Sequence, residues 1–344
     1  MKARPFLALL LALALTAVGL GAGGWWLVWQ RGPLALQHRS GTLPLAARFV
    51  PRQAPLSLYL LSDGEEPVAY ARAVAPSRDR RQAAAALQRL RDGAFAAAGL
   101  DYGNELASWL APEISLALFD LPGNDSASGS ATAPGANWLL ALRSRDGDGA
   151  RRFLQRFWQT RSLAGADLQV SRYRGMGLIS GRGALAGRSP VPLATALISD
   201  DLLLIASGRG VLEQALDVSQ IDELNQAADP GLRQGLQSLG DGAALVVARS
   251  PGLAAGLGLP PQPGSGTLLL ASLRPEGSAL RLEGVLQRPD LDNEPSASPP
   301  LAAAERRSLL TAAPPASDSL ALLSNPAQLL RSEEHTSELQ SHSD

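Results

Sequence analysis

Residues 193–207, LATALISDDLLLIAS, decide the fold. Two apolar runs, 193–198 and 202–207, flank a short polar stretch at 199–201. Apolar runs of this length that are separated by a tight polar segment are typical of a β-hairpin. We therefore expect two antiparallel strands with a turn between them.

Further elements lie on both sides of this hairpin. Short apolar or alternating runs predict strands at 56–61, 113–120, 138–142, 168–173, 177–181, 243–248, 267–273 and 280–286. Apolar residues at helical spacing predict helices at 78–98, 102–110, 150–160, 211–218 and 230–239. Strands mostly follow strands, which favours an α+β fold with a largely antiparallel sheet and packed helices over a doubly wound parallel sheet.

The uncharged run 6–28, FLALLLALALTAVGLGAGGWWLV, predicts a single transmembrane helix before this domain. At ~1.5 Å per residue the run is long enough to cross a hydrocarbon core of ~30 Å. Lys2 and Arg4 favour a cytoplasmic N-terminus, and the tryptophan cluster suits the opposite interface. A cleavable signal peptide is the alternative, because 19–24 supplies small residues. Both interpretations place the main domain outside the cytoplasm, in the periplasm or a lumen.

Composition shifts divide the chain into six parts. We expect an anchor at 1–29, a stalk at 30–54, an extracytoplasmic α+β domain at 55–287, a Pro/Ser-rich linker at 288–312, the truncated start of a second repeat at 313–330 and an artefact at 331–344. The repeat is suggested by ASDSLALLS at 316–324, which echoes APLSLYLLS at 54–62. The last part, RSEEHTSELQSHSD, resembles a translated sequencing adapter.

The composition excludes several classes of chemistry. The chain has no Cys, so disulfides and thiolate catalysis are absent. Lys2 is the only lysine, and a formal net charge of −1 provides no basic surface for nucleic acid. We therefore expect no nucleic-acid partner; the expected partners are membrane lipid, through the N-terminal helix, and an unknown protein or small-molecule ligand.

Paired carboxylates are the first candidates for acid–base work or for a hard metal ion. The pairs are Glu65-Glu66, Asp146/Asp148 and Asp200-Asp201. All lie beside glycine or in predicted turns, where Asp commonly serves the turn itself. We interpret them as structural.

Histidine is scarce in this chain. His38 is the only histidine before residue 331, and it lies in the predicted stalk. A zinc site needs several His or Cys ligands, and a Ser-His-Asp triad needs a placed His. Lys2 lies at the cytoplasmic end, so a Ser-Lys pair is also excluded. We assign no catalytic, cofactor-binding or metal-ligating residue and expect no cofactor.

The tetrapeptide Ser-Gly-Arg-Gly occurs at 180–183 and again at 207–210. Each copy has the composition of an anion-binding backbone nest, with Arg182 or Arg209 as the counter-charge. The alternative is that the glycines only serve strand ends and turns.

A second basic feature is the Arg151, Arg152 and Arg156 face of the predicted helix at 150–160. It predicts a solvated surface, with contact to acidic lipid headgroups as an alternative.

Five segments resemble, in order, a bacterial domain family of unknown function. They are FVPRQAPLSLYLLSD at 49–63, RLRDGAFAAAGLDYGNELASWLAPEISLALFD at 89–120, NWLLALRSRDGDGARRFLQRFW at 137–158, SRYRGMGLISG at 171–181 and LATALISDDLLLIASGRGVLEQALD at 193–217. The cyanobacterial members of that family are membrane-anchored envelope proteins. The resemblance implies the same address and carries over no catalytic residue.

These features lead to one functional hypothesis and two alternatives. We expect a non-enzymatic, single-pass anchored envelope protein with a binding or scaffolding domain. A hydrolase completed by further C-terminal sequence, and an anchored carrier of lipids or small molecules, remain open.

Overall fold

The computed structural model describes residues 33–38, 42–97, 99–120, 137–163, 165–183, 191–240, 242–250, 252, 266–287, 307–308 and 311. The chain divides into two compact units, 1–287 and 288–344, and the elements below belong to the first. The predicted anchor, most of the linker, the second repeat and 331–344 lie outside the described residues. Within the described part, no helix has the length and hydrophobicity needed to span a bilayer.

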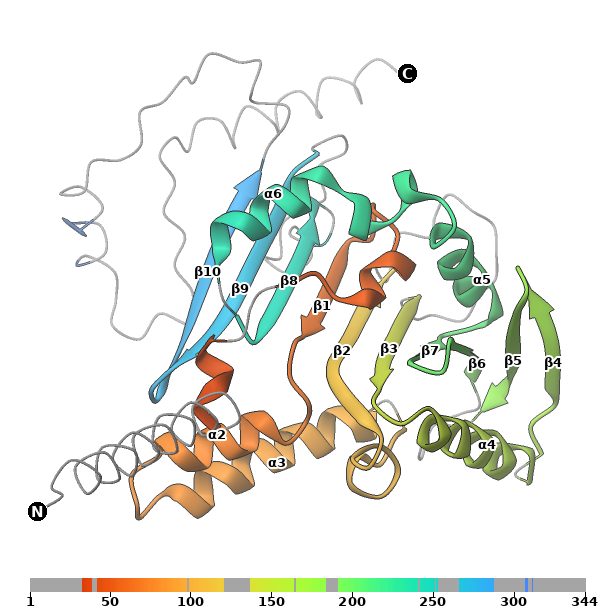
Figure 1. Ribbon diagram of the computed structural model, residues 1–344, viewed down its shortest axis with the longest axis horizontal. Coiled ribbons are helices and arrows are strands. Elements are labelled where there is room, and N and C mark those ends of the chain that lie inside the picture. The colour runs from red at the N-terminus through yellow and green to blue at the C-terminus, as the bar shows by residue number, and fades with distance from the viewer. Residues whose placement is uncertain are drawn as a thin grey trace, which may run out of the picture. The chain divides into compact units, whose positions relative to one another are not determined.

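The first unit is built on a ten-stranded sheet in which every paired neighbour is antiparallel (Figure 1). The strand order is β10-β9-β8-β1-β2-β3-β7-β6-β5-β4. The strands are β1 Leu56–Leu60, β2 Leu110–Leu118, β3 Trp138–Ser144, β4 Leu168–Tyr173, β5 Met176–Gly183, β6 Val191–Ile198, β7 Leu202–Ala206, β8 Ala244–Arg249, β9 Leu268–Glu276 and β10 Ala279–Gln287. The predicted α+β class with an antiparallel sheet is confirmed.

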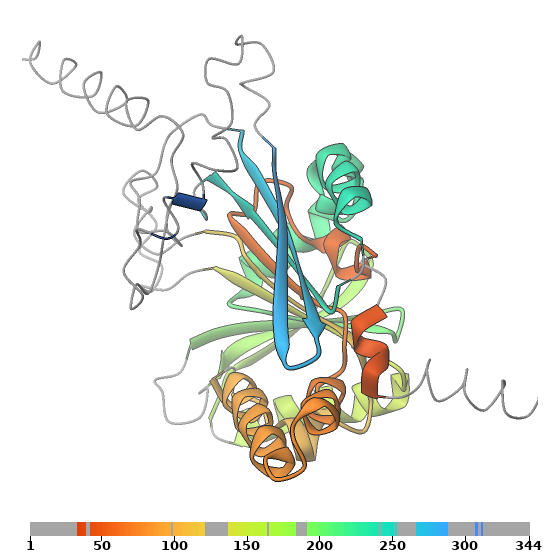
Figure 2. The same cartoon turned by 90° about the vertical axis from the view of Figure 1, so that its left-hand side faces the viewer.

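Helices pack against this sheet. They are α2 Glu66–Val74, α3 Arg80–Ala97, α4 Gly147–Leu163, α5 Arg209–Val218 and α6 Pro230–Leu239, with one π-helical turn, η3 Tyr102–Leu106. Short 3-10 turns are η1 Pro33–His38, η2 Leu45–Phe49, η5 Asp222–Leu224 and η6 Gln226–Ala228. Figure 2 shows α6 on one side of the strands β8, β9 and β10.

Two hydrophobic cores form on opposite faces of the sheet, because successive strand residues point to opposite sides. In β7, Leu204 belongs to the core that includes residues of η2, α5 and α6, which we call core A. Its neighbour Leu203 belongs to the core that includes residues of η3 and α4, which we call core B. Both side chains are fully buried, so this central strand is shared by two cores.

The hairpin predicted at 193–207 is confirmed as β6–β7. Its turn closes where the Asp201 N–H donates to the Ile198 carbonyl at 3.1 Å. Ser199 and Asp200 have φ of 48° and 64°. Positive φ at both central residues is typical of a type I′ turn, which matches the right-handed twist of antiparallel strands.

Two expectations differ from the structure, and one helix was not expected. Residues 30–54 were expected to form a stalk, but Ala46, Ala47 and Phe49 are buried in core A. Small apolar side chains in η2 allow this segment to approach the sheet closely. Helix α2 was not predicted at all. The helix predicted at 102–110 is only the single turn η3, since Leu110 already begins strand β2.

Candidate functional site

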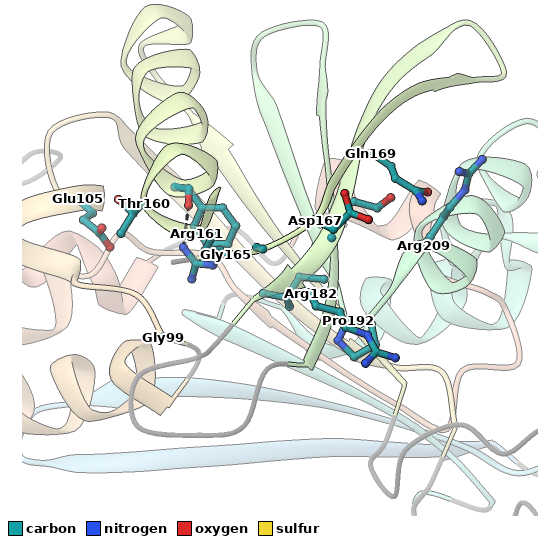
Figure 3. A pocket seen from close by; sticks show the side chains of 15 residues that line it. Gly99, Glu105, Thr160, Arg161, Gly165, Asp167, Gln169, Arg182, Pro192 and Arg209 are labelled. Atoms are coloured by element: carbon teal, nitrogen blue, oxygen red, sulfur yellow. Dashed lines mark hydrogen bonds between the residues drawn. The ribbon is translucent and has the colours of Figure 1, made fainter. Parts of the chain in front are cut away.

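A cavity of about 840 Å³ lies at one end of the sheet (Figure 3). Strand β4 begins there, β5 ends there and β6 begins there, because these three strands are antiparallel neighbours. The C-terminal turn of α4 and the first residue of α5 add further side chains. In Figure 3, Glu105, Thr160 and Arg161 lie at one side, and Asp167, Arg182 and Arg209 at the other.

Arg161 supplies a half-buried cation to this cavity. Its guanidinium carbon lies 3.5 Å from the centre of the Phe157 ring, and Nη1 donates to the Phe157 carbonyl at 2.9 Å. Nε is buried and has no hydrogen-bond partner. Burial lowers the pKa of Arg161, and the negative charge of Glu105 opposes this shift. Among the residues that the structure describes, Arg161 makes no ion pair.

The two Ser-Gly-Arg-Gly segments meet at this cavity. Arg182 in β5 pairs with Pro192 in β6. On the other side of Pro192 lies Gly208, where an added Cβ would be 3.6 Å from the Pro192 Cβ. Strand β6 therefore brings the two tetrapeptides together, and both of their arginines line the cavity.

The glycines of these segments have a packing role as well. A Cβ at Gly181 would come within 2.8 Å of the Asp167 carbonyl and of a Leu168 methyl group, so a side chain there would separate β4 from β5. Gly210, in contrast, has open space around it. Gly181 therefore has the structural role of letting β4 and β5 pack closely. That Arg182 and Arg209 line the same cavity is a separate observation.

The charge of the cavity is mixed. Arg209 is paired with Glu213 at 2.7 Å, so its charge is largely balanced. Arg182 makes no ion pair within the described part of the chain. Glu105 and Asp167 supply two carboxylates to the lining. The lining therefore combines two guanidinium groups that make no ion pair in the described part with two acidic groups.

The predicted carboxylate pairs are dispersed over caps, turns and surface ion pairs. Glu65 pairs with Arg91 at 2.7 Å, while Glu66 accepts from the Asp63 N–H at 3.2 Å at the start of α2. Asp146 accepts from the Asp148 N–H at 3.1 Å, which fixes the start of α4.

The hairpin-turn carboxylate is tied to the basic face of α4. Arg151 bridges Asp148, at 2.5 Å, and Asp200 of the β6–β7 turn. Arg152 lies 3.4 Å from Asp146. Two arginines of the predicted basic face are therefore ion-paired within the protein.

Two buried acidic residues were not identified as candidates from the sequence. Glu113 is buried; it accepts from Arg143 at 2.9 Å and from the Ala46 N–H at 3.3 Å. Asp229 is 4% exposed and pairs with Arg52 at 3.2 Å and with Arg249. Both join segments that are distant in the sequence, so we interpret them as structural.

The remaining candidates have no site in the described residues. His38 ends the turn η1. In the described part, no group of three or more His, Cys, Asp or Glu is arranged to hold a metal ion. Arg161 and Asp167 were missed as lining residues because each lies at the end of an element, where spacing carries no information about the partner elements.

Two crystal forms of TP0453, I and III, give TM-scores of 0.36 each, with 10% and 11% identity, and cover 73% and 72% of this chain and 81% and 80% of theirs. No curated protein matches. A family model described as a protein of unknown function (DUF3352) matches residues 9–329. The chain therefore belongs to the DUF3352 family of proteins of unknown function.

Proposed function

We propose that the chain is a single-pass, membrane-anchored envelope protein whose α+β domain binds a ligand outside the cytoplasm and does not catalyse a reaction. The apolar run 6–28 supports the anchor, since it is long enough for a bilayer and bears no charge. Lys2 and Arg4 support a cytoplasmic N-terminus.

The cavity at the end of the sheet is the observation that carries the binding role. Concave sites with a few convergent polar groups are the usual ligand-binding places of a fold. Thr160 and Ser180 are the hydroxyls of its lining. Neither hydroxyl is hydrogen-bonded to a His, Lys or carboxylate side chain among the described residues. A hydroxyl nucleophile needs such a base, so the cavity does not fit hydrolysis through Thr160 or Ser180.

The character of the cavities favours a polar ligand over an acyl chain. Each of four cavities in the described part has charged side chains in its lining. A carrier for apolar lipid tails needs an apolar cavity, because burying unpaired charges against hydrocarbon is costly. For the cavities in the described part, the charged lining supports a carrier of small polar molecules more than a carrier of acyl chains.

The absence of cysteine allows a direct test of the membrane topology. We would introduce Gln155→Cys on the exposed face of α4. Cells whose outer envelope is opened while the inner membrane stays intact would then be treated with a membrane-impermeant maleimide. We expect labelling without permeabilising the inner membrane. Ala3→Cys is the matched control and should be labelled only after permeabilisation.

Two outcomes would contradict the proposal. Labelling of Gln155→Cys only after permeabilisation would place the domain in the cytoplasm. A mature protein that has lost the Ala3→Cys site would show that the N-terminal segment is cleaved, so that it is not an anchor.

A further inference from the structure

Strand β10 forms one end of the sheet and presents a regular edge (Figure 1). It pairs one-to-one with β9 from Ala279 to Gln287, without a bulge, and contains no proline or lysine. The hairpin turn is held in place where Tyr70 Oη donates to the Gly277 carbonyl at 2.8 Å. Natural proteins usually protect such an edge, because its free backbone groups can pair with another strand. Within the described part of the chain, no strand pairs with the outer side of β10.

The hairpin geometry decides which backbone groups lie on this edge. The turn between β9 and β10 has two residues, and the residues that flank it, Glu276 and Ala279, form a hydrogen-bonded pair. Hydrogen-bonded pairs alternate with non-hydrogen-bonded pairs along antiparallel strands. The N–H and C=O groups that point away from β9 therefore belong to every second residue, namely Leu280, Leu282, Gly284 and Leu286.

The same positions carry exposed leucine side chains. Leu280, Leu282 and Leu286 are 68%, 66% and 54% exposed. Val285 packs against core A, so the leucines, at the alternate positions, point to the other face of the sheet. An apolar row beside a free strand edge is typical of a surface that another strand can extend.

Charge selects one register for two copies of this strand. With a two-fold axis at Leu282, Arg281 of each copy lies opposite Glu283 of the other, because each is one residue from the axis. An axis at Arg281 or at Glu283 would oppose like charges, which is destabilising. An axis at Gly284 would place Glu283 opposite Val285 and leave the charges without cross-strand partners.

The register centred on Leu282 also satisfies the backbone and the side chains. Leu282 has outward backbone groups, so the two copies of this residue can exchange both hydrogen bonds. Leu280 of each copy lies opposite Gly284 of the other, where the missing side chain leaves room for leucine. Helix α6 is placed away from the axis, since its Gly231 carbonyl accepts from Gln287 at the far end of β10.

We propose that β10 pairs with β10 of a second copy of this chain, antiparallel and with the two-fold axis at Leu282, so that the sheets of two protomers become continuous. Backbone hydrogen bonds and leucine burial supply the attraction. Arg281 and Glu283 already pair within one chain at 2.7 Å. In the dimer they form a network of alternating charge, which fixes the register more than it adds affinity.

The other edge strand, β4, does not offer the same complementarity. It exposes Val170, at 78%, but carries Arg172 and no acidic residue. Two copies of β4 would therefore form no ion pair across their contact. The proposed dimer depends neither on the ligand of the domain nor on the N-terminal anchor.

The absence of cysteine allows a test by single-cysteine cross-linking of the full-length chain in non-ionic detergent. Mild oxidation should convert Leu282→Cys to a disulfide-linked dimer, because the register places this position opposite itself at the ~5.5 Å Cα separation that a disulfide can span. Leu286→Cys is the matched control on the same strand. Two copies of position 286 would lie about 27 Å apart at the usual rise of a strand, so this variant should remain monomeric on a non-reducing gel.

Charge reversal tests the same contact without a cysteine. In sedimentation velocity, Arg281→Glu should weaken the dimer at least about tenfold, because carboxylates then face each other on both sides of the axis. Adding Glu283→Arg to this variant should recover most of the affinity, since opposite charges face each other again. Arg172→Glu, exposed on β4, is the control and should leave the dimer unchanged. Circular dichroism checks that each variant is folded.

Either of two results would overturn the inference. One is a folded Leu282→Cys chain that cross-links no more than Leu286→Cys, which would place any association at another surface. The other is a wild-type chain that stays monomeric at every concentration, or a dimer that is unaffected by Arg281→Glu. Labelling of Gln155→Cys tests the membrane topology separately, so failure of the dimer and failure of the proposed topology are distinguishable.

Discussion

Asp229 joins three functions in one side chain. It is the N-cap of α6, where its carboxylate accepts from the Gly231 N–H at 2.9 Å. The same carboxylate accepts hydrogen bonds from Arg52, in the segment before β1, and from Arg249, at the end of β8. A buried carboxylate is tolerated only with such partners, because an unpaired buried charge is strongly destabilising.

The lowered pKa of Asp229 predicts that part of the free energy of unfolding is lost in acid. Burial alone would raise this pKa, but the hydrogen bond from Arg52 and the charges of Arg249 and Arg52 hold it below its usual value. The folded protein thus binds the Asp229 proton more weakly than the unfolded chain. This contribution is complete above the unfolded pKa of ~3.9 and is lost as the pH falls through the folded pKa.

We expect Asp229→Asn to lower the free energy of unfolding by about 3 kcal/mol at neutral pH, since two arginines lose their counter-ion. Urea unfolding at pH 7 and at several values below pH 4 measures this. The difference in the free energy of unfolding between Asp229→Asn and the wild type should become smaller at acid pH. Asp222→Asn, an exposed neighbour, is the control and should change stability by less than about 0.5 kcal/mol. A pH-independent difference would contradict the assignment.

Only half of the role of Asp229 was predictable from the sequence. An Asp directly before Pro230 is a common helix start, and the helix at 230–239 was predicted correctly. Its partner Arg52 is 177 positions away. Contacts over such separations depend on the sheet order, which no local pattern contains.

Helix α2 shows the same limit for an element. Its start carries a capping pattern: Asp63 Oδ1 accepts from the Glu66 N–H at 2.9 Å, and Glu66 accepts from the Asp63 N–H. Pro67 follows within the first turn. Only Val68 and Tyr70 are buried, so the apolar stripe is too short to be recognised by periodicity. The cap was the available signal.

We expect Asp63→Ala to destabilise the start of α2 by about 1 kcal/mol, because its carboxylate accepts from the Glu65 and Glu66 N–H groups as a capping side chain does. Hydrogen exchange of the α2 amides should accelerate more than that of the sheet, because the cap serves this helix alone. Arg72→Ala, exposed on the same helix, is the matched control and should leave the exchange rates unchanged. Equal acceleration throughout the domain would show instead that α2 opens only with global unfolding.

The sheet order is the main feature that local patterns did not contain. Strand β1 lies between β2 and β8, although β8 begins at Ala244, far along the chain. Hairpins such as β6–β7 follow from turn chemistry and adjacent apolar runs. The central place of β1 depends on non-local pairing. The cavity depends on how η3, α4 and α5 pack around the locally paired strands β4, β5 and β6. The Ser-Gly-Arg-Gly repeat was visible in the sequence, but its convergence was not.

At the scale of the whole first unit, one sheet carries two cores. Among the tryptophans that the structure describes, none lies in core A, whereas Trp109 and Trp158 are buried in core B and Trp138 packs against it. Because both cores share strands β3 and β7, loss of either core should remove the support of the other. We therefore expect the two faces to unfold together.

Two leucines of strand β7 test this coupling. Leu204→Ala in core A and Leu203→Ala in core B should each destabilise the domain by about 3 kcal/mol, since both side chains are fully buried. The reporter is tryptophan fluorescence during urea unfolding, in a chain whose Trp25, Trp26 and Trp29 are replaced by Phe.

Coupling predicts that Leu204→Ala shifts the midpoint of this core B signal as much as Leu203→Ala does. Val170→Ala, which removes a side chain that is 78% exposed on the edge strand β4, is the control and should barely shift it. Independent cores would give a different pattern: Leu204→Ala would lower the midpoint seen by far-ultraviolet circular dichroism and leave the fluorescence midpoint in place. The shared strand makes that separation unfavourable, because unfolding core A withdraws half of the burial that holds β7 in the sheet.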